Sequence, residues 1–292
     1  MAAVRVTVDL PYDLNLPRGE YPAGEKERVT LAKVVVLSPT HEPRPIRTRI
    51  SCIFDAPDEI DRDSAMRLAA RKADKVIRHA NRLLRWYRQL SSLPGILEVT
   101  RAQVSPIKFT VVNSERSQIA PVQSWVLPVL EFEAEQPVSA QFATIDDLAA
   151  ALRENLETAN EPDVAHLNLL DAQHAKSVGR FREAVLLSWS VIDSSFVGKF
   201  EALVDEKLAK EWGEARDFLK GHDFGLRHRM TSGLRLIAGR SFFDEPNGFW
   251  NQLSTSYGKR NAIIHGGFGA DEDDAEQAIT VARKVLDIID TL

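Results

Sequence analysis

Residues 181–200 read FREAVLLSWSVIDSSFVGKF, and their apolar side chains recur at steps of three and four residues. That spacing places them on one side of an α-helix, which is the pattern of a helix that buries one stripe against a core. The same stripe continues upstream. We predict one long helix that carries Leu167, Leu170, Val178, Phe181, Val185, Trp189, Ile192, Phe196 and Phe200. The C-terminal half of the chain is therefore expected to be all-helical.

The segments around this helix also carry helix signals. Thr144 precedes an amphipathic run and is a suitable N-cap, while Gly221 and Gly266–Gly267 are suitable helix ends. Asn247 is a second suitable N-cap. Helices are predicted at 202–220, about 225–239 and 247–266, with a last helix after the acidic stretch ADEDDAEQ whose buried face carries Val281, Val285, Ile288 and Ile289.

The first part of the chain alternates between apolar and polar residues, as β-strands do. Val4, Val6 and Val8 fall on one face of a strand, with polar residues between them. Further strands are predicted at 28–37, 46–54, 108–113 and 125–135, and one long helix from about Asp61 to Leu90. We expect an α+β fold, with a mixed domain of a sheet and a long helix in residues 1–140 and a helical domain in residues 141–292.

The charge of the chain is unevenly distributed. The net charge is −5, but residues 1–140 carry 20 Lys and Arg against 17 Asp and Glu, whereas the remainder carries 17 against 25. This asymmetry indicates two units with different surfaces. No apolar run approaches the roughly 18 residues that span a bilayer, and the N-terminus lacks a secretory pattern. A cytoplasmic protein without membrane contact is the expectation.

The metal-binding residue types show no ligand pattern. The single cysteine, Cys52, has no second thiol for a disulfide or a zinc cluster, and its strand-like surroundings predict a buried core thiol. The histidines at 41, 79, 166, 174, 222 and 228 lack metal-ligand spacing, and no glycine-rich loop carries a phosphate-binding lysine. No metal or other cofactor is predicted.

Three polar residues gather on one predicted helix. In SYGKRNAIIHGG, residues 256–267, Arg260, Asn261 and His265 lie within an arc of about 140°. A histidine can move the proton of a ribose 2′-hydroxyl near neutral pH, and an arginine can hold a phosphate with two hydrogen bonds. This combination is suited to cleaving RNA. The alternative is structural, because a histidine in the last turn of a helix also caps it.

A second Arg/His pair has the same kind of spacing. Arg216 lies six residues before His222, but the pair straddles Gly221, so the two residues are not expected on one helix. We therefore prefer Arg260 and His265 as the candidate site.

The stretch SYGKRNAIIHGG resembles the Arg-polar-x-x-x-His motif of HEPN domains, most closely the Apea-like group of bacterial defence and abortive-infection proteins. FREAVLLSWSVIDSSF resembles an earlier core helix of that family, where an acidic residue often faces the motif. Asp193 occupies that place in this sequence. The resemblance covers roughly residues 145–292, whereas the N-terminal half resembles no family that we can name.

The resemblance implies an activity and an assembly. Many HEPN proteins are metal-independent endoribonucleases in which two protomers pair and line one cleft with both Arg/His sets, leaving a 2′,3′-cyclic phosphate. By this resemblance His265 is the acid or base, Arg260 stabilises the transition state, Asn261 fills the polar position and Asp193 is an anchor behind them. It further implies RNA as substrate, a homodimer through the helical domain and a possible regulatory partner protein. Other HEPN domains have lost catalysis and serve as binding or dimerisation modules.

The long N-terminal helix carries a basic stripe. Arg67, Arg71, Lys75, Arg78, Arg82 and Arg85 follow helical spacing, opposite an apolar face. Such a stripe can follow a nucleic-acid backbone, although a solvated helix face is the commoner case. Trp86 and Tyr87 are expected either to stack on a base or to anchor the helix to the sheet.

Overall fold

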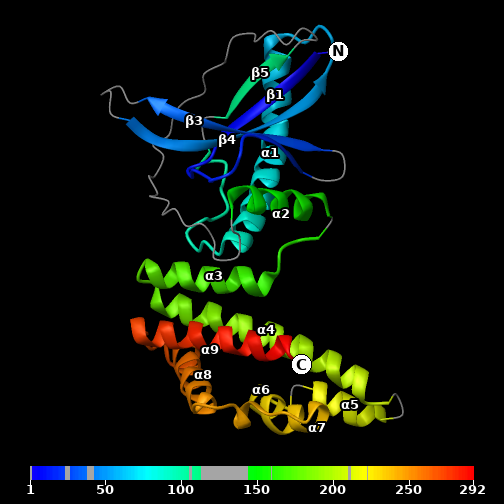
Figure 1. Cartoon of the computed structure of the whole chain (residues 1–292), viewed down its shortest axis with the longest axis vertical. Coiled ribbons are helices and arrows are strands. Elements are labelled where there is room, and N and C mark those ends of the chain that lie inside the picture. Colours follow the sequence, from blue (N-terminus) through cyan, green and yellow to red (C-terminus); the bar gives the residue numbers. More distant parts are fainter. Residues whose placement is uncertain are drawn as a thin grey trace. The chain divides into compact units, whose positions relative to one another are not determined.

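The chain forms two compact units, Met1–Pro162 (unit 1) and Asp163–Leu292 (unit 2), in a computed structural model (Figure 1). The structure describes residues 2–23, 27–37, 43–104, 107–112, 144–158, 160–209, 212–221 and 223–292. The strand predicted at 125–135 lies outside these residues. Among the described helices, none is both long enough and apolar enough to cross a bilayer.

Unit 1 is built on a five-stranded sheet of order β2-β3-β4-β1-β5, in which all neighbouring strands are antiparallel. Its strands are β1 (Ala2–Asp9), β2 (Gly19–Pro22), β3 (Arg28–Leu37), β4 (Pro43–Ala56) and β5 (Lys108–Val112). Val4, Val6 and Val8 are fully buried, which confirms the predicted inward face of β1. The short strand β2 was not predicted.

The long helix α1 (Arg62–Ser91) packs on β1, β4 and β5, close to its predicted bounds. Asp61 is its N-cap and accepts a hydrogen bond from the Ser64 backbone. Trp86 and Tyr87 are buried in the core of unit 1, so they anchor the helix. Cys52 lies in the same core, and burial raises the pKa of its thiol to about 12.

The boundary between the units lies later than predicted. Thr144 caps helix α2 (Ile145–Glu157) through a capping box with Asp147, as the sequence indicated. However, α2 packs against α1 and β2, and its apolar residues Leu148, Ala149, Leu152 and Leu156 join the core of unit 1. The boundary predicted between residues 140 and 141 is therefore moved to Pro162/Asp163.

Unit 2 is centred on two helices where the sequence predicted one. Helices α3 (Val164–Ser177) and α4 (Phe181–Lys207) are separated by Gly179, which adopts a left-handed φ of 75°. Turn hydrogen bonds from the backbones of Gly179 and Arg180 close the end of α3. The chain reverses there, and α3 packs back on α4. Val178 consequently lies exposed rather than in the apolar stripe.

The remaining helices surround α4. They are α5 (Gly213–Lys220), α6 (Leu226–His228), a π-helical turn (Arg229–Gly233), α7 (Leu234–Ala238), a 3₁₀ turn (Phe242–Asp244), α8 (Phe249–Gly266) and α9 (Glu272–Asp290). The N-cap of α8 is Gly248 rather than the predicted Asn247. Helix α9 starts within the acidic stretch, because Asp271 caps it through a capping box with Asp274.

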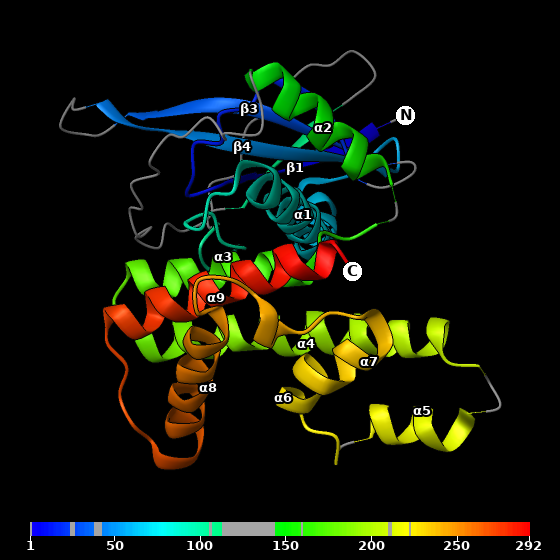
Figure 2. The same ribbon diagram turned by 60° about the horizontal axis from the view of Figure 1, so that its bottom comes forward.

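The core of unit 2 lies along α4. Helices α3, α4 and α9 run side by side, and α8 leaves them at a steep angle (Figure 2). Trp189, Phe196 and Phe200 of α4 are almost completely buried, and the Phe196 ring meets Phe242 at 5.4 Å between centroids. The predicted inner face of α9 is also buried. The apolar stripe therefore performs the packing expected of it, although it belongs to two helices.

Candidate active site

The site is built where α8 crosses α4. The Trp189 indole donates a buried hydrogen bond of 2.9 Å to Ser256 Oγ, and its ring meets Tyr257 edge-on at 5.2 Å. Four residues further along each helix, about one turn, Asp193 and Arg260 meet in an ion pair. The packed Trp189–Ser256 contact thus fixes the position of the polar pair beside it.

Arg260 is held on three sides. Its Nη2 donates to Asp193 Oδ2 at 3.3 Å, and its Nη1 donates to Asn261 Oδ1 at 2.9 Å. The guanidinium also lies over the Tyr257 ring, 6.0 Å from its centroid. The side chain of Arg260 nevertheless stays 25% exposed. It is therefore oriented before any ligand binds and is still accessible to one.

The surroundings of Asp193 disfavour the charged form of its carboxyl. Burial raises the pKa of its carboxyl above the ordinary value, and the attraction of Arg260 only partly opposes this effect. A carboxyl whose pKa is shifted by burial beside a specific charged partner is a candidate functional residue.

His265 lies in the last turn of α8 and is exposed. It follows Asn261 by four residues, so both side chains project from the same flank of the helix. Within the described part of the chain, the imidazole makes no hydrogen bond or ion pair. The helix end is closed by backbone instead, because the N–H groups of Gly267 and Phe268 both point to the Ala262 carbonyl. His265 is thus not needed as a cap.

The structure therefore brings Asp193, Arg260 and Asn261 into direct contact and places His265 one turn further along the same helix. Sequence reasoning named these four residues. It missed the bond between Trp189 and Ser256, because a tryptophan in an apolar stripe reads as core and its polar N–H is overlooked.

In the competing Arg216/His222 pair, the arginine has partners within unit 2. Arg216 forms an ion pair with Asp205, which Lys220 also contacts, and donates to the Leu208 carbonyl. His222 lies outside the described residues. Arg216 therefore ties α5 to the end of α4.

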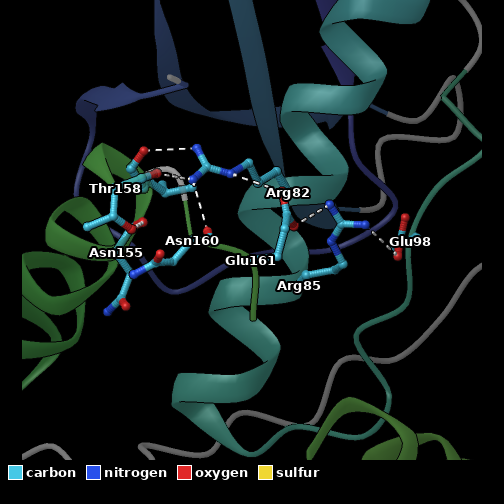
Figure 3. Close-up of polar contacts among 8 residues, drawn as sticks. Arg82, Arg85, Glu98, Asn155, Thr158, Asn160 and Glu161 are labelled. Carbon is cyan, nitrogen blue, oxygen red and sulfur yellow. Dashed lines mark hydrogen bonds and ion pairs between the residues drawn. The ribbon is translucent and has the colours of Figure 1, made fainter. Parts of the chain in front are cut away.

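The basic stripe of α1 is largely engaged within unit 1. Lys75 pairs with Glu27, and Arg85 pairs with Glu161 at 2.9 Å. Arg82 reaches the end of α2, where it donates to the carbonyls of Leu156, Thr158 and Asn160 (Figure 3). These three cations have partners within unit 1, so the stripe does not present all six of its cations to a nucleic acid.

Three members of the predicted stripe remain available. Arg67, Arg71 and Arg78 are exposed on α1, and for them nucleic-acid contact stays a prediction. Three surface cations are weak support for a nucleic-acid binding track, because a basic stripe acts through many neutralised phosphates.

The chemistry of the site is that of an oriented cation beside an exposed imidazole. The cation suits a phosphate, and the imidazole suits proton transfer. Among the described residues, no group of three or more His, Cys, Asp or Glu side chains is placed to hold a metal ion. No protein-family model, curated protein or solved structure matches this chain.

Proposed function

We propose that unit 2 is a metal-independent endoribonuclease domain of a cytoplasmic bacterial defence or toxin-type system. The observation that supports it best is the double anchoring of Arg260 by Asp193 and Asn261, one helical turn from the exposed His265. The resemblance of residues 256–267 to the HEPN motif supports the same reaction.

In the proposed reaction the ribose 2′-oxygen attacks the adjacent phosphorus, and the bond from phosphorus to the 5′-oxygen breaks. The products are a 2′,3′-cyclic phosphate and a 5′-hydroxyl. His265 takes the 2′-hydroxyl proton or gives a proton to the leaving 5′-oxygen, and Arg260 stabilises the charge that develops on the phosphoryl oxygens. Asn261 and Asp193 keep the guanidinium in place.

A single His265 carries out only one of these two proton transfers in each cleavage. A second protomer would supply a second His265, so the proposal includes a homodimer through unit 2. Ile264 and Phe268 support it, because they flank His265 and are 48% and 64% exposed. A partner protein that silences or triggers the enzyme would act on the same dimer.

The test compares the wild type with the Arg260→Ala/His265→Ala double variant on total RNA and tRNA in EDTA, with the product ends mapped. We expect cyclic-phosphate ends from the wild type alone. His265→Ala by itself should lose about 10²–10⁴ in rate, the usual effect of losing a general acid or base. Arg182→Ala, which changes an exposed arginine on α4, is the control and should cleave normally. Equal cleavage by His265→Ala and the wild type would refute the site.

A second candidate function is a non-catalytic dimerisation or binding module. The exposed apolar pair Ile264 and Phe268 favours it, because such side chains around a motif also make an interface. This function predicts no cleavage of any RNA, normal behaviour of Arg260→Ala, and a loss of self-association in Ile264→Asp measured by light scattering.

A further inference from the structure

Two aromatic rings and a guanidinium meet on the surface of unit 2, away from Arg260. The Arg227 guanidinium lies over the Trp250 indole, 5.3 Å from its centroid, and the Phe243 ring lies 6.2 Å from Trp250. Phe243 is 64% exposed, and Arg227 is exposed as well. We call these three residues the Arg–aromatic platform.

The charge of Arg227 is not neutralised by a carboxylate among the described residues. Its guanidinium donates to Ser254 Oγ at 3.3 Å. Two nearby arginines do have carboxylate partners, because Arg235 pairs with Asp244 and Arg240 pairs with Glu245. A cation that is exposed, stacked on an indole and free of an acidic partner is available to a phosphate.

The sequence around the platform is basic inside an acidic half of the chain. Residues 224–270 contain six Arg and Lys against two Asp and Glu, whereas residues 141–292 as a whole contain 17 against 25. Helix α8 itself contains no acidic residue. Positive charge is therefore concentrated in the segment that carries both the platform and the candidate active site, which favours an anionic ligand.

The platform and His265 share one flank of α8. Trp250, Ser254, Tyr257, Asn261 and His265 follow at steps of four, three, four and four residues, which is the spacing of a single helical stripe. The fifteen steps along the helix from Trp250 to His265 give a rise of about 22 Å. A single strand of a few nucleotides covers that length.

A surface hollow of about 620 Å³ adjoins Phe243. Its lining consists of Thr231 and Ser232 from the π-helical turn, Arg235 and Leu236 from α7, and Ser241 and Phe243 at the start of the 3₁₀ turn. Hydroxyl groups beside an exposed ring suit a nucleoside, which offers a flat base and a polar sugar. π-Helical turns are frequent at functional sites.

We propose that the Arg–aromatic platform binds single-stranded RNA, with a base stacked on Phe243 or Trp250 and a phosphate held by Arg227. The strand then follows the flank of α8, which brings a phosphate several nucleotides away to Arg260 and His265. The path of the RNA strand from the platform to the phosphate that is cleaved rests on the proposed ribonuclease function. Binding of RNA at the platform is tested without that function.

The first experiment measures binding of the full chain to a fluorescent 2′-O-methyl oligoadenylate, which cannot be cleaved by 2′-hydroxyl attack. Phe243→Ala should weaken the Kd about 5- to 150-fold, the range for loss of one base–aromatic stack. Arg227→Gln should lower the slope of log Kd against log salt by about 0.7, the value for one phosphate contact on a single strand. The controls are Phe218→Ala and Arg182→Gln, an exposed ring and an exposed arginine elsewhere in unit 2, and they should bind as the wild type.

The second experiment compares cleavage of the dinucleotide UpA with cleavage of longer oligonucleotides. The dinucleotide is too short to reach the platform, so Phe243→Ala should cleave it at the wild-type rate, which also shows that the fold is intact. The gain in kcat/KM with increasing length should be reduced in Phe243→Ala and kept in Phe218→Ala.

Three results overturn or separate the two proposals. Unchanged affinity in both platform variants overturns the platform. A change in self-association without a change in RNA affinity assigns the surface to a protein partner and overturns it too. Weaker binding in the variants of a protein that cleaves no RNA supports the platform while the ribonuclease proposal fails.

Discussion

At the scale of single residues, two opposing effects act on the pKa of the Asp193 carboxyl. Burial raises the pKa of its carboxyl, and the ion pair with Arg260 only partly offsets that change. Because the folded-state pKa lies above the unfolded one, the folded protein binds more protons between these two values. Stability therefore falls as the pH rises through that interval, and the ionised carboxylate is a net cost at neutral pH.

Asp193→Asn should remove this cost and keep an oxygen that can accept from Arg260. We expect its free energy of unfolding, measured by urea denaturation at pH 7, to be no lower than that of the wild type, with any advantage lost at acidic pH. RNA cleavage should fall several-fold, because Arg260 loses its charged partner.

Asp205→Asn is the matched control, because the pKa of Asp205 is shifted in the opposite direction from that of Asp193. Hydrogen bonds from Lys220 and Arg216 lower the pKa of Asp205, so its stabilising effect is present above the unfolded pKa and is lost as the pH falls. This variant should be less stable than the wild type at pH 7. An Asp193→Asn protein that was also destabilised at pH 7 would contradict our account of the Asp193 carboxyl.

Residue types and spacing predicted part of this site. Arg260, Asn261 and His265 lie in the last two turns of one helix, so their common arc follows from the 3.6-residue period alone. The contacts of Lys75, Arg82 and Arg85 did not follow, because a stripe on one helix does not tell which carboxylates and carbonyls the fold will bring to it. The ribonuclease activity itself stays a prediction.

At the scale of elements, the end of α8 positions His265. Gly267 adopts a φ of 65° and directs its N–H to the Ala262 carbonyl. A side chain in this left-handed conformation costs about 1–2 kcal/mol. Gly267→Ala should lower the free energy of unfolding by that amount and loosen the turn that carries His265, which hydrogen exchange of its amides would detect.

Gly258→Ala is the control on the same helix. Gly258 lies within α8, and a Cβ there meets nothing within 4 Å. Alanine should therefore stabilise the helix by about 0.5–1 kcal/mol. If both variants shifted the unfolding midpoint in the same direction, the backbone conformation at Gly267 would not be what controls the helix end.

The contact between α1 and α2 depends on Arg82. Its side chain is 13% exposed and donates to carbonyl groups at the end of α2, which have no partner within that helix. Arg82→Met should destabilise unit 1 by about 1–3 kcal/mol, because the carbonyls at the end of α2 lose a charged donor.

Arg78→Met is the comparison, because Arg78 belongs to the same predicted basic stripe but is exposed. It should change the unfolding free energy by no more than about 0.5 kcal/mol. Thermal denaturation of both variants decides the question. Equal effects would mean that Arg82 is a surface charge like Arg78, and the basic stripe would again be a candidate for nucleic-acid binding.

Periodicity predicted most elements and failed where two elements share a pattern. The apolar stripe continues from α3 into α4, so the reversal at Gly179 is not visible in the spacing of the apolar residues. Gly179 itself was the available signal, since a glycine just after a helical run commonly ends the helix.

At the scale of the whole molecule, the sequence predicted two units but assigned α2 to the wrong one. An amphipathic helix shows that it has a buried face and does not show which core will bury it. The strand pattern had ended before α2, which made the start of a helical domain the natural reading. The structure places Leu148, Leu152 and Leu156 of α2 in the core of unit 1.

The boundary can be tested with fragments of the chain. Residues 1–162 should unfold in one cooperative transition, and residues 1–140 should unfold at a lower temperature because they lack the apolar face of α2. Residues 163–292 should fold alone, since their core is complete without α2.

The decisive comparison is between residues 141–292 and 163–292. The longer fragment carries α2 without its packing partners, so its four buried apolar residues become exposed surface. We expect it to be no more stable than the shorter fragment and more prone to self-association, measured by calorimetry and light scattering. A longer fragment that was clearly more stable, together with equal midpoints for residues 1–140 and 1–162, would return α2 to the helical domain.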